Sequence, residues 1–282
     1  MSNSIRNLIN KIDEDAKLKE LIEGKRVCIC GPSTSNKDTD YGYQIDSYDV
    51  VCRVNWHLTG KNGWDQELVK DFGNRTDIIF SNVGPFYKCL FDDIVNREDE
   101  KSPYHCFKDL KYIYFIDPIN LEKFLITNKE YFKINGDKYI SNPELFYDKA
   151  KEIITDFGIC NRYLQKEDNL DYMKKNMNLS LSSVEPMTSS GIHAIQCILR
   201  HKPKELFITG MNFGNFGRGG KQEELYSNGS IQWKYIPPEK YKNKIFKIHT
   251  FPITLHFFKK ILEEYPNIKL DNLLNKFYNS KV

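Results

Sequence analysis

The feature that most constrains this chain is a series of short apolar runs separated by longer, helix-like segments. The apolar runs cover residues 27–30, 49–54, 77–81, 112–116, 205–209 and 268–270. Runs of this length predict strands that are covered on both faces. Helical patterns cover residues 3–22, 85–95, 143–157, 188–200 and 251–264. This alternation predicts an α/β fold built on a doubly wound, mostly parallel, Rossmann-like sheet, in which ligands bind beyond the carboxyl ends of the strands.

The length and composition are those of one globular domain. The chain has 282 residues, of which 40% are hydrophobic and 28% charged, and we expect residues 1–282 to form a single domain. One stretch, residues 214–247, is rich in glycine and holds Pro237 and Pro238. It is too long for an ordinary connection, and long loops are usually functional lids or disordered segments. Of these two we favour a lid-type insertion.

Charge and N-terminal composition exclude some classes of partner. The net charge is only +3 and no dense basic stripe occurs, so we expect no nucleic-acid partner. A weakly positive cleft would still suit a small anion. The first 25 residues contain no apolar core of a signal peptide and no membrane span, which predicts a cytoplasmic protein.

The cysteines and acidic residues do not indicate a metal site. Seven scattered cysteines include no CxxC pair, which predicts free thiols in a reducing compartment, several of them in buried strands. Asp38-Thr39-Asp40 resembles the metal-binding triplet of many nucleotide-sugar enzymes. It lies in a polar loop rather than at the end of an apolar strand, so we interpret it as a solvated turn. No His/Cys cluster has metal-ligand spacing, and we expect no metal or other cofactor.

Candidate ligand-binding residues follow the predicted strands. Gly31, Pro32 and Ser33 come directly after the first strand, where a glycine lets the backbone approach a phosphate or ribose. Asn55 and Asn82 follow the next two strands, and their amides could bind a pyrimidine or a sugar hydroxyl. Arg53 is either a ligand contact or the partner of a nearby carboxylate, and Asn55 could instead cap a turn.

Two further candidates lie at predicted helix starts. Thr188, Ser189, Ser190 and Gly191 open a helix, where hydroxyls and free amides form either an anion site or a plain N-cap. His249 precedes a helix with Pro252 in its first turn. It could face the cleft as a general base, or it could be a packed histidine. We expect His256, inside that helix, to lie in the core, and His193 and His201 to be packing or surface residues.

Taken together, these segments resemble the sialyltransferases of glycosyltransferase family 29. The large sialyl motif is matched by Gly31, Tyr41-Gly42, Ile45-Asp46, Asp49-Val50-Val51, Arg53, Asn55, Gly73 and Arg75-Thr76. Pro186, Thr188, Gly191 and the stretch 207–210 resemble the small motif, and His249 resembles the histidine of the last motif. The chain is also similar to the bacterial sialyltransferases of family 42. It differs from these families at Pro32, Thr254 and Gly214, where they carry Asn, Glu and Tyr, and it does not clearly reproduce the disulfide between the two sialyl motifs.

The resemblance implies a GT-A-like variant of the fold and an inverting, metal-independent transfer of sialic acid from CMP-sialic acid to a glycan hydroxyl. It implies that His249 is the general base and that the donor is held by Gly31, Pro32, Ser33, Asn55, Asn82, Thr188, Ser189, Ser190 and Gly191. The expected partners are a CMP-sugar donor and a glycan acceptor. Two alternatives stay open: a transferase for another CMP-linked acid sugar such as Kdo, and a catalytically inactive nucleotide-binding module.

Overall fold

The computed structural model describes residues 4–31, 36, 38–54, 66–81, 109–115, 159–160, 172, 190–211, 221–225, 231–235 and 251–279. The strands are β1 (Arg26–Cys30), β2 (Val50–Val54), β3 (Ile78–Ser81), β4 (Tyr112–Phe115), β5 (Ile159–Cys160), β6 (Glu205–Thr209), β7 (Lys221–Leu225), β8 (Ile231–Tyr235) and β9 (Ile268–Leu270). The helices are α1 (Ile5–Ile9), α2 (Ala16–Ile22), α3 (Gly42–Asp46), α4 (Gln66–Phe72), α11 (Ser190–Arg200), α12 (Phe251–Glu264) and α13 (Asn272–Asn279).

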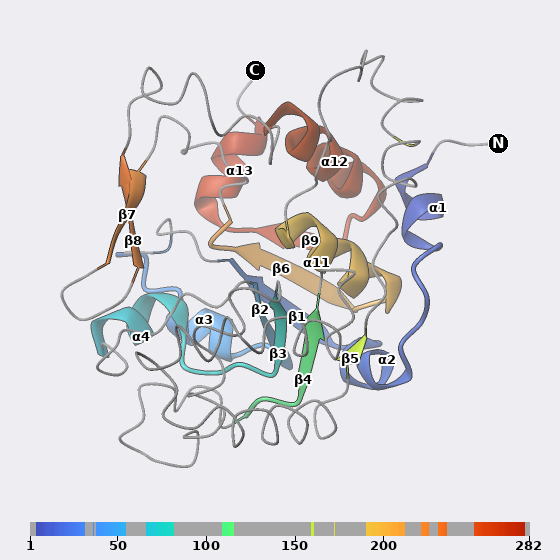
Figure 1. The fold of residues 1–282 in the computed structure, drawn as a ribbon, viewed down its shortest axis with the longest axis horizontal. Helices are drawn as coiled ribbons and strands as arrows, with labels where there is room; N and C mark the ends of the chain where they lie inside the picture. Colours follow the sequence, from blue (N-terminus) through green and yellow to red (C-terminus); the bar gives the residue numbers. More distant parts are fainter. Residues whose placement is uncertain are drawn as a thin grey trace, which may run out of the picture.

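A parallel sheet lies at the centre of the described part of the chain (Figure 1). Its strand order is β5-β4-β3-β2-β1-β6-β9, and every neighbouring pair is parallel. Strands β7 and β8 form a separate antiparallel pair. From β1 the chain adds strands on one side as far as β5, and then returns to place β6 on the other side. The point where the order reverses, between β1 and β6, is where ligands bind in open α/β sheets.

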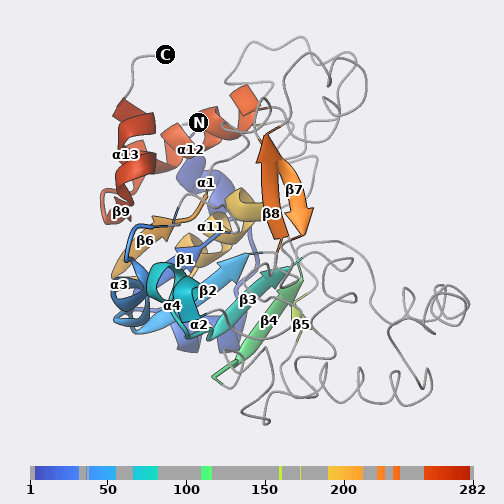
Figure 2. The ribbon, with the colours of Figure 1, turned by 90° about the vertical axis from the view of Figure 1, so that its left-hand side faces the viewer.

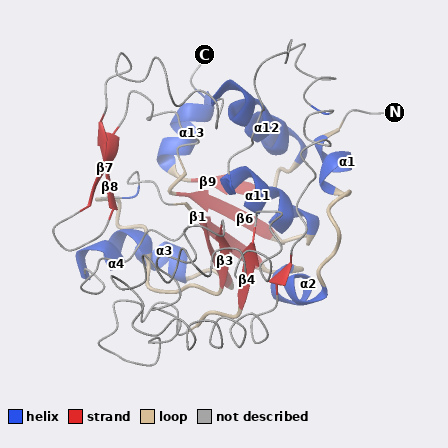
Figure 3. Ribbon diagram, viewed as in Figure 1, coloured by secondary structure: helices blue, strands red, loops and turns tan. Residues whose placement is uncertain are grey.

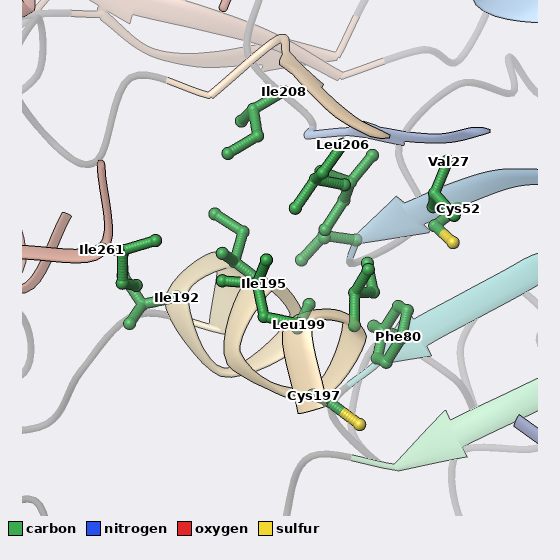
Figure 4. Close-up of a cluster of buried hydrophobic side chains, with 14 of the residues drawn as sticks. Val27, Cys52, Phe80, Ile192, Ile195, Cys197, Leu199, Leu206, Ile208 and Ile261 are labelled. Carbon is green, nitrogen blue, oxygen red and sulfur yellow. The ribbon is translucent and has the colours of Figure 1, made fainter. Parts of the chain in front are cut away.

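Helices cover both faces of this sheet, as a doubly wound fold requires (Figures 2 and 3). On one face, side chains from alternate strand positions pack with α1, α11 and α12 in the main core. On the other face, Cys28, Val51 and Phe207 pack with side chains of α3 and α4. Figure 4 shows Ile195 and Leu199 of α11 among strand side chains such as Leu206. Full burial of each such side chain contributes about 1.5–3 kcal/mol. The α/β prediction is therefore confirmed.

The predicted helix over residues 3–22 is wrong in one respect, because the structure divides it into α1 and α2. Asp15 starts α2 by accepting a hydrogen bond from the Leu18 amide (2.7 Å), and its other oxygen accepts one from the Tyr112 hydroxyl (2.7 Å). Glu264, at the end of α12, accepts the Ile5 amide (2.8 Å). The acidic residues thus cap new helix starts and tie both helices to the sheet and to α12.

The predicted strands all appear, each within about two residues of its expected bounds. Helices α11 and α12 are also confirmed, whereas the predicted helices 85–95 and 143–157 lie outside the described residues. The short helices α3 and α4 were not predicted, nor were α13 and strands β5, β7 and β8. Four cysteines are buried free thiols, as expected: Cys28, Cys30, Cys52 and Cys197. Within the described residues, no helix is long and apolar enough to cross a membrane.

Candidate functional site

At the reversal point of the sheet, the backbones that leave β1 and β6 touch. The Gly31 amide donates to the Thr209 carbonyl (2.9 Å). A Cβ on Gly31 would lie 2.5 Å from the Gly210 carbonyl oxygen and 2.5 Å from Cγ of Met211. Gly210 has a φ of +64°, and a Cβ there would lie 2.7 Å from the Gly31 carbonyl oxygen. Both positions therefore require glycine. We call this reversal point of the sheet the crevice, because ligands of open α/β sheets bind there.

Asn36 fixes the far end of the loop that begins at Gly31. It is fully buried and its Oδ1 accepts a hydrogen bond from Thr209 Oγ1 (2.8 Å). Its Nδ2 donates to Cys30 Sγ (3.8 Å). Gly31 and Asn36 are thus both bonded to the end of β6, on either side of the candidate loop, whereas Pro32 and Ser33 lie outside the described residues.

The turn after Asn36 is held by a buried carboxylate. Asp71, in the last turn of α4, accepts the backbone amides of Asp38 (2.7 Å), Thr39 (3.0 Å) and Asp40 (2.9 Å). Both aspartates of the turn are exposed, which confirms the interpretation of this triplet as a solvated turn. Among the residues that the structure describes, no group of three His, Cys, Asp or Glu could hold a metal ion.

Asp271 fixes the other wall of the crevice. This buried residue directly follows β9 and accepts the Gly210 amide (3.2 Å) and the Leu274 amide (2.7 Å). The second bond caps the first turn of α13. The Tyr41 hydroxyl accepts the amide of Asn272 (3.2 Å). Sequence reasoning missed Asn36, Asp71 and Asp271 because each is recognised mainly by partners that are distant in sequence: the Thr209 hydroxyl for Asn36, and backbone amides for Asp71 and Asp271.

Arg53 contacts the protein rather than an exposed crevice. It is 2% exposed, and it donates to Thr76 Oγ1 (2.8 Å) and to the carbonyls of Phe72 (2.9 Å) and Arg75 (2.9 Å). Among the described residues no ion pair with a carboxylate is found for Arg53, so the predicted carboxylate partner is not observed, while the role as a ligand contact stays a prediction. Burial raises the pKa of the neighbouring Cys30 thiol, and the Arg53 charge offsets part of that rise. Arg53 therefore fastens β2 to the turn before β3.

Of the remaining candidates, the structure describes only Ser190 and Gly191. Asn55 and Asn82 lie outside the described residues, but they directly follow β2 and β3, which are parallel neighbours with Val54 opposite Phe80. Their strands therefore end at one edge, as predicted. Ser190 and Gly191 are half-buried in the first turn of α11. The structure does not describe Thr188 and Ser189 before them, nor His249 before α12.

His201 is a packing residue, as expected. It is 2% exposed, and its Nε2 lies 3.1 Å from the Asp15 amide. Because that amide can only donate, Nε2 must accept, and Nδ1–H donates to the Cys197 carbonyl (2.8 Å). Burial lowers the pKa of His201, although the bond to the Cys197 carbonyl opposes this. The side chain of His256 is not among those described.

The described residues thus bring the backbones of Gly31 and Gly210 together with the side chains of Asn36 and Thr209 at the reversal point of the sheet. Backbone amides, hydroxyls and a helix start bind anions such as the phosphate of a nucleotide.

Comparisons with known proteins give structural likeness at low identity. No family model matches the chain, and no curated protein matches it. A Campylobacter jejuni α-2,3-sialyltransferase in apo form has a TM-score of 0.49 and 16% identity, and the match covers 94% of this chain and 84% of that one. The sialyltransferase CstII from the same organism has a TM-score of 0.46 and 16% identity, and the match covers 92% of this chain and 88% of that one. A mammalian sialyltransferase has a TM-score of 0.44 and 18% identity, and the match covers 94% of this chain and 76% of that one. At this distance the likeness does not carry an activity over to this chain.

Proposed function

We propose that this chain is an inverting glycosyltransferase that moves sialic acid from CMP-sialic acid to a glycan hydroxyl. One observation carries the proposal. The stretch that resembles the large sialyl motif begins at Gly31, and the stretch that resembles the small motif ends at Gly210. These two glycines are in backbone contact at the reversal point of the sheet, where ligands bind in such folds. Two motifs far apart in sequence therefore meet at one candidate site.

Each candidate residue has a role in this proposal. The loop 31–33, Asn55 and Asn82 hold the cytidine and its phosphate, and the start of α11 at Thr188–Gly191 holds the donor's carboxylate. The acceptor hydroxyl attacks the anomeric carbon from the face opposite CMP, so the new C–O bond forms as the bond to the phosphate oxygen breaks. The hydroxyl proton goes to His249, and CMP leaves with the bonding electron pair. Hydrogen-bond donors around the leaving phosphate stabilise its growing charge.

We also propose that the transfer needs no metal ion. Asp38 and Asp40 are exposed, and Asp71, the buried carboxylate beside them, is occupied by three backbone amides. These contacts leave the triplet without a converging set of carboxylates. Transfer should therefore persist in excess EDTA.

A coupled assay of CMP release from CMP-sialic acid, with and without a lactose-type acceptor, tests the proposal. We expect acceptor-dependent release, and we expect His249→Ala to lose about 10²–10⁴-fold in turnover while it still binds CMP, because the base acts only in the chemical step. His256→Ala is the matched control from the same region and should keep its turnover per folded molecule.

Three results would count against the proposal. Binding of CMP without any release would favour the inactive nucleotide-binding module, which the replacements at Pro32 and Thr254 would then explain. Release from CMP-Kdo but not from CMP-sialic acid would change the donor. Near-normal transfer by His249→Ala, with inactive but folded His256→Ala, would exchange the roles of the two histidines.

A further inference from the structure

We propose that Asp71 is a positioning residue: from α4 it holds the turn 38–40 and, through that turn, it holds Asn36 against the end of β6, a position that nucleotide binding requires. It does so without touching the ligand. The proposal rests on the proposed function for its ligand, but the contacts that define it belong to the described residues alone.

A continuous series of hydrogen bonds leads from Asp71 to the crevice. The carboxylate accepts three successive amides, those of residues 38–40. Thr39 in turn donates to the Asn36 carbonyl through both its amide (3.2 Å) and its Oγ1 (2.5 Å). The Asn36 side chain then bonds to Thr209 Oγ1 (2.8 Å) and Cys30 Sγ (3.8 Å). Asp71 thus fixes the turn, the turn fixes Asn36, and Asn36 fixes the end of the loop against β6.

The backbone of the turn needs this carboxylate. Asp38 and Asp40 have φ values of 62° and 56°, in the left-handed region that is unfavourable for a non-glycine residue. Three amides that point at one site create a local positive potential, which only an anionic acceptor matches fully. An Asn at position 71 would keep the size of Asp71 but remove its charge. It would also bring an NH₂ group toward at least one amide donor. We therefore expect Asp71→Asn to release the turn.

Release of the turn would weaken binding of the ligand. With Asn36 displaced, its side-chain bonds to Thr209 and Cys30 would be lost. A loop that must first be ordered weakens ligand binding, because its ordering costs free energy on association. Because Asp71 acts on binding rather than on the proton transfer at His249, the loss should appear in the Kd for CMP and in the KM for the donor, with kcat nearly unchanged.

Asp46 offers a matched control. Its carboxylate accepts two successive amides, those of Asn74 (2.7 Å) and Arg75 (3.0 Å), in the turn before β3. Asp46→Asn makes the same chemical change in a similar structural setting, but among the described residues that turn forms no hydrogen bond to Gly31 or Asn36. A merely structural role for Asp71 would give the two variants the same pattern of effects.

The test combines hydrogen–deuterium exchange with calorimetry on the full chain. We expect Asp71→Asn to raise amide exchange in residues 33–40 and to weaken CMP binding by about tenfold or more. Asp46→Asn should leave both unchanged while it lowers the melting temperature to a similar extent. If Asp71→Asn fails to fold, Thr39→Val removes one bond of the same series, and we expect smaller changes in the same direction.

The possible outcomes separate the two proposals. If amide exchange in residues 33–40 is unchanged in Asp71→Asn, or in Thr39→Val where that variant replaces it, Asp71 does not anchor this segment and the proposal is overturned. If amide exchange is faster in Asp71→Asn but its CMP affinity equals that of Asp46→Asn, the anchoring has no effect on the ligand, and that part of the proposal is overturned. A wild-type chain that does not bind CMP would overturn the proposed function, whereas the exchange data would still decide whether Asp71 anchors the loop.

Discussion

The two edges of the parallel sheet use their carboxylates differently. At the amino edge, Asp77 pairs with Arg75 (2.9 Å) and Lys111 (2.7 Å), and Glu205 pairs with Lys269 (2.6 Å). At the carboxyl edge, Asp71 and Asp271 bond to backbone amides of loops and of α13. At the amino edge the carboxylates thus form ion pairs as well as bonds to amides, since Asp77 also accepts the Val51 amide (2.8 Å) and Asp49 accepts the Arg26 amide (2.8 Å). For the carboxylates of Asp71 and Asp271 the described bonds are all to backbone amides, and these amides belong to the segments beside Gly31 and Gly210.

This difference explains how one sheet can be both stable and open to a ligand. Ion pairs at the amino edge tie neighbouring strands together where no ligand needs to enter. Glycines at the carboxyl edge remove side chains from the crevice, and buried carboxylates compensate by fixing the loops around it. We therefore expect substitutions of the same kind to lower the free energy of unfolding at both edges, but to weaken ligand binding mainly at the carboxyl edge.

The largest loss of stability should come from Arg53. In Arg53→Leu the carbonyls of Phe72 and Arg75 lose their donor, and each buried unsatisfied group costs about 1–3 kcal/mol. We expect urea unfolding to show a loss of about 3–5 kcal/mol, with Arg53→Lys intermediate because an ammonium group cannot span the same acceptors. A loss of CMP affinity in Arg53→Lys with unchanged stability would instead place Arg53 among the ligand contacts.

Two glycines with left-handed backbones allow a matched comparison of the edges. Gly24 (φ +71°) would have no atom within 4 Å of an added Cβ, whereas a Cβ on Gly210 (φ +64°) would lie 2.7 Å from the Gly31 oxygen. Both alanine variants should lose about 1–2 kcal/mol to backbone strain. Gly210→Ala should lose about 1–3 kcal/mol more to overpacking, together with at least tenfold in CMP affinity measured by calorimetry. Equal CMP affinities in the two variants would show that the crevice at Gly210 is not part of the CMP-binding site.

A smaller, pH-dependent effect should come from His201, far from the crevice. Since burial holds its pKa below the ordinary value, the unfolded chain binds a proton more readily than the folded one. Stability from this site is complete above the ordinary histidine pKa, about 6.5, and falls as the pH decreases below it. Urea unfolding between pH 7.5 and about 5 should show a steeper loss for the wild type than for His201→Gln. Equal slopes would contradict this account, and CMP affinity at pH 7.5 should be the same in both proteins.

The sequence predicted the central sheet well because its strands are short, apolar and buried on both faces. It predicted the helices α11 and α12 for a similar reason, since each has a clear start and apolar residues at helical spacing. It did not separate α1 from α2, because the cap at Asp15 depends on partners such as Tyr112 that are distant in sequence. The same limit applies to the candidate site: Gly31 was identified from its place after a strand, but the contacts of Asn36 and Asp71 required the fold.

Calorimetric titration of the wild-type chain with cytidine and uridine nucleotides tests the central claim most directly. If the crevice between β1 and β6 holds the nucleotide of a CMP-sugar, CMP and CDP should bind more tightly than UMP, UDP or GDP. The same phosphates on a different base should bind more weakly, because the base contacts at the ends of β2 and β3 would be lost. Equal affinities for all five, or a preference for uridine nucleotides, would contradict the account.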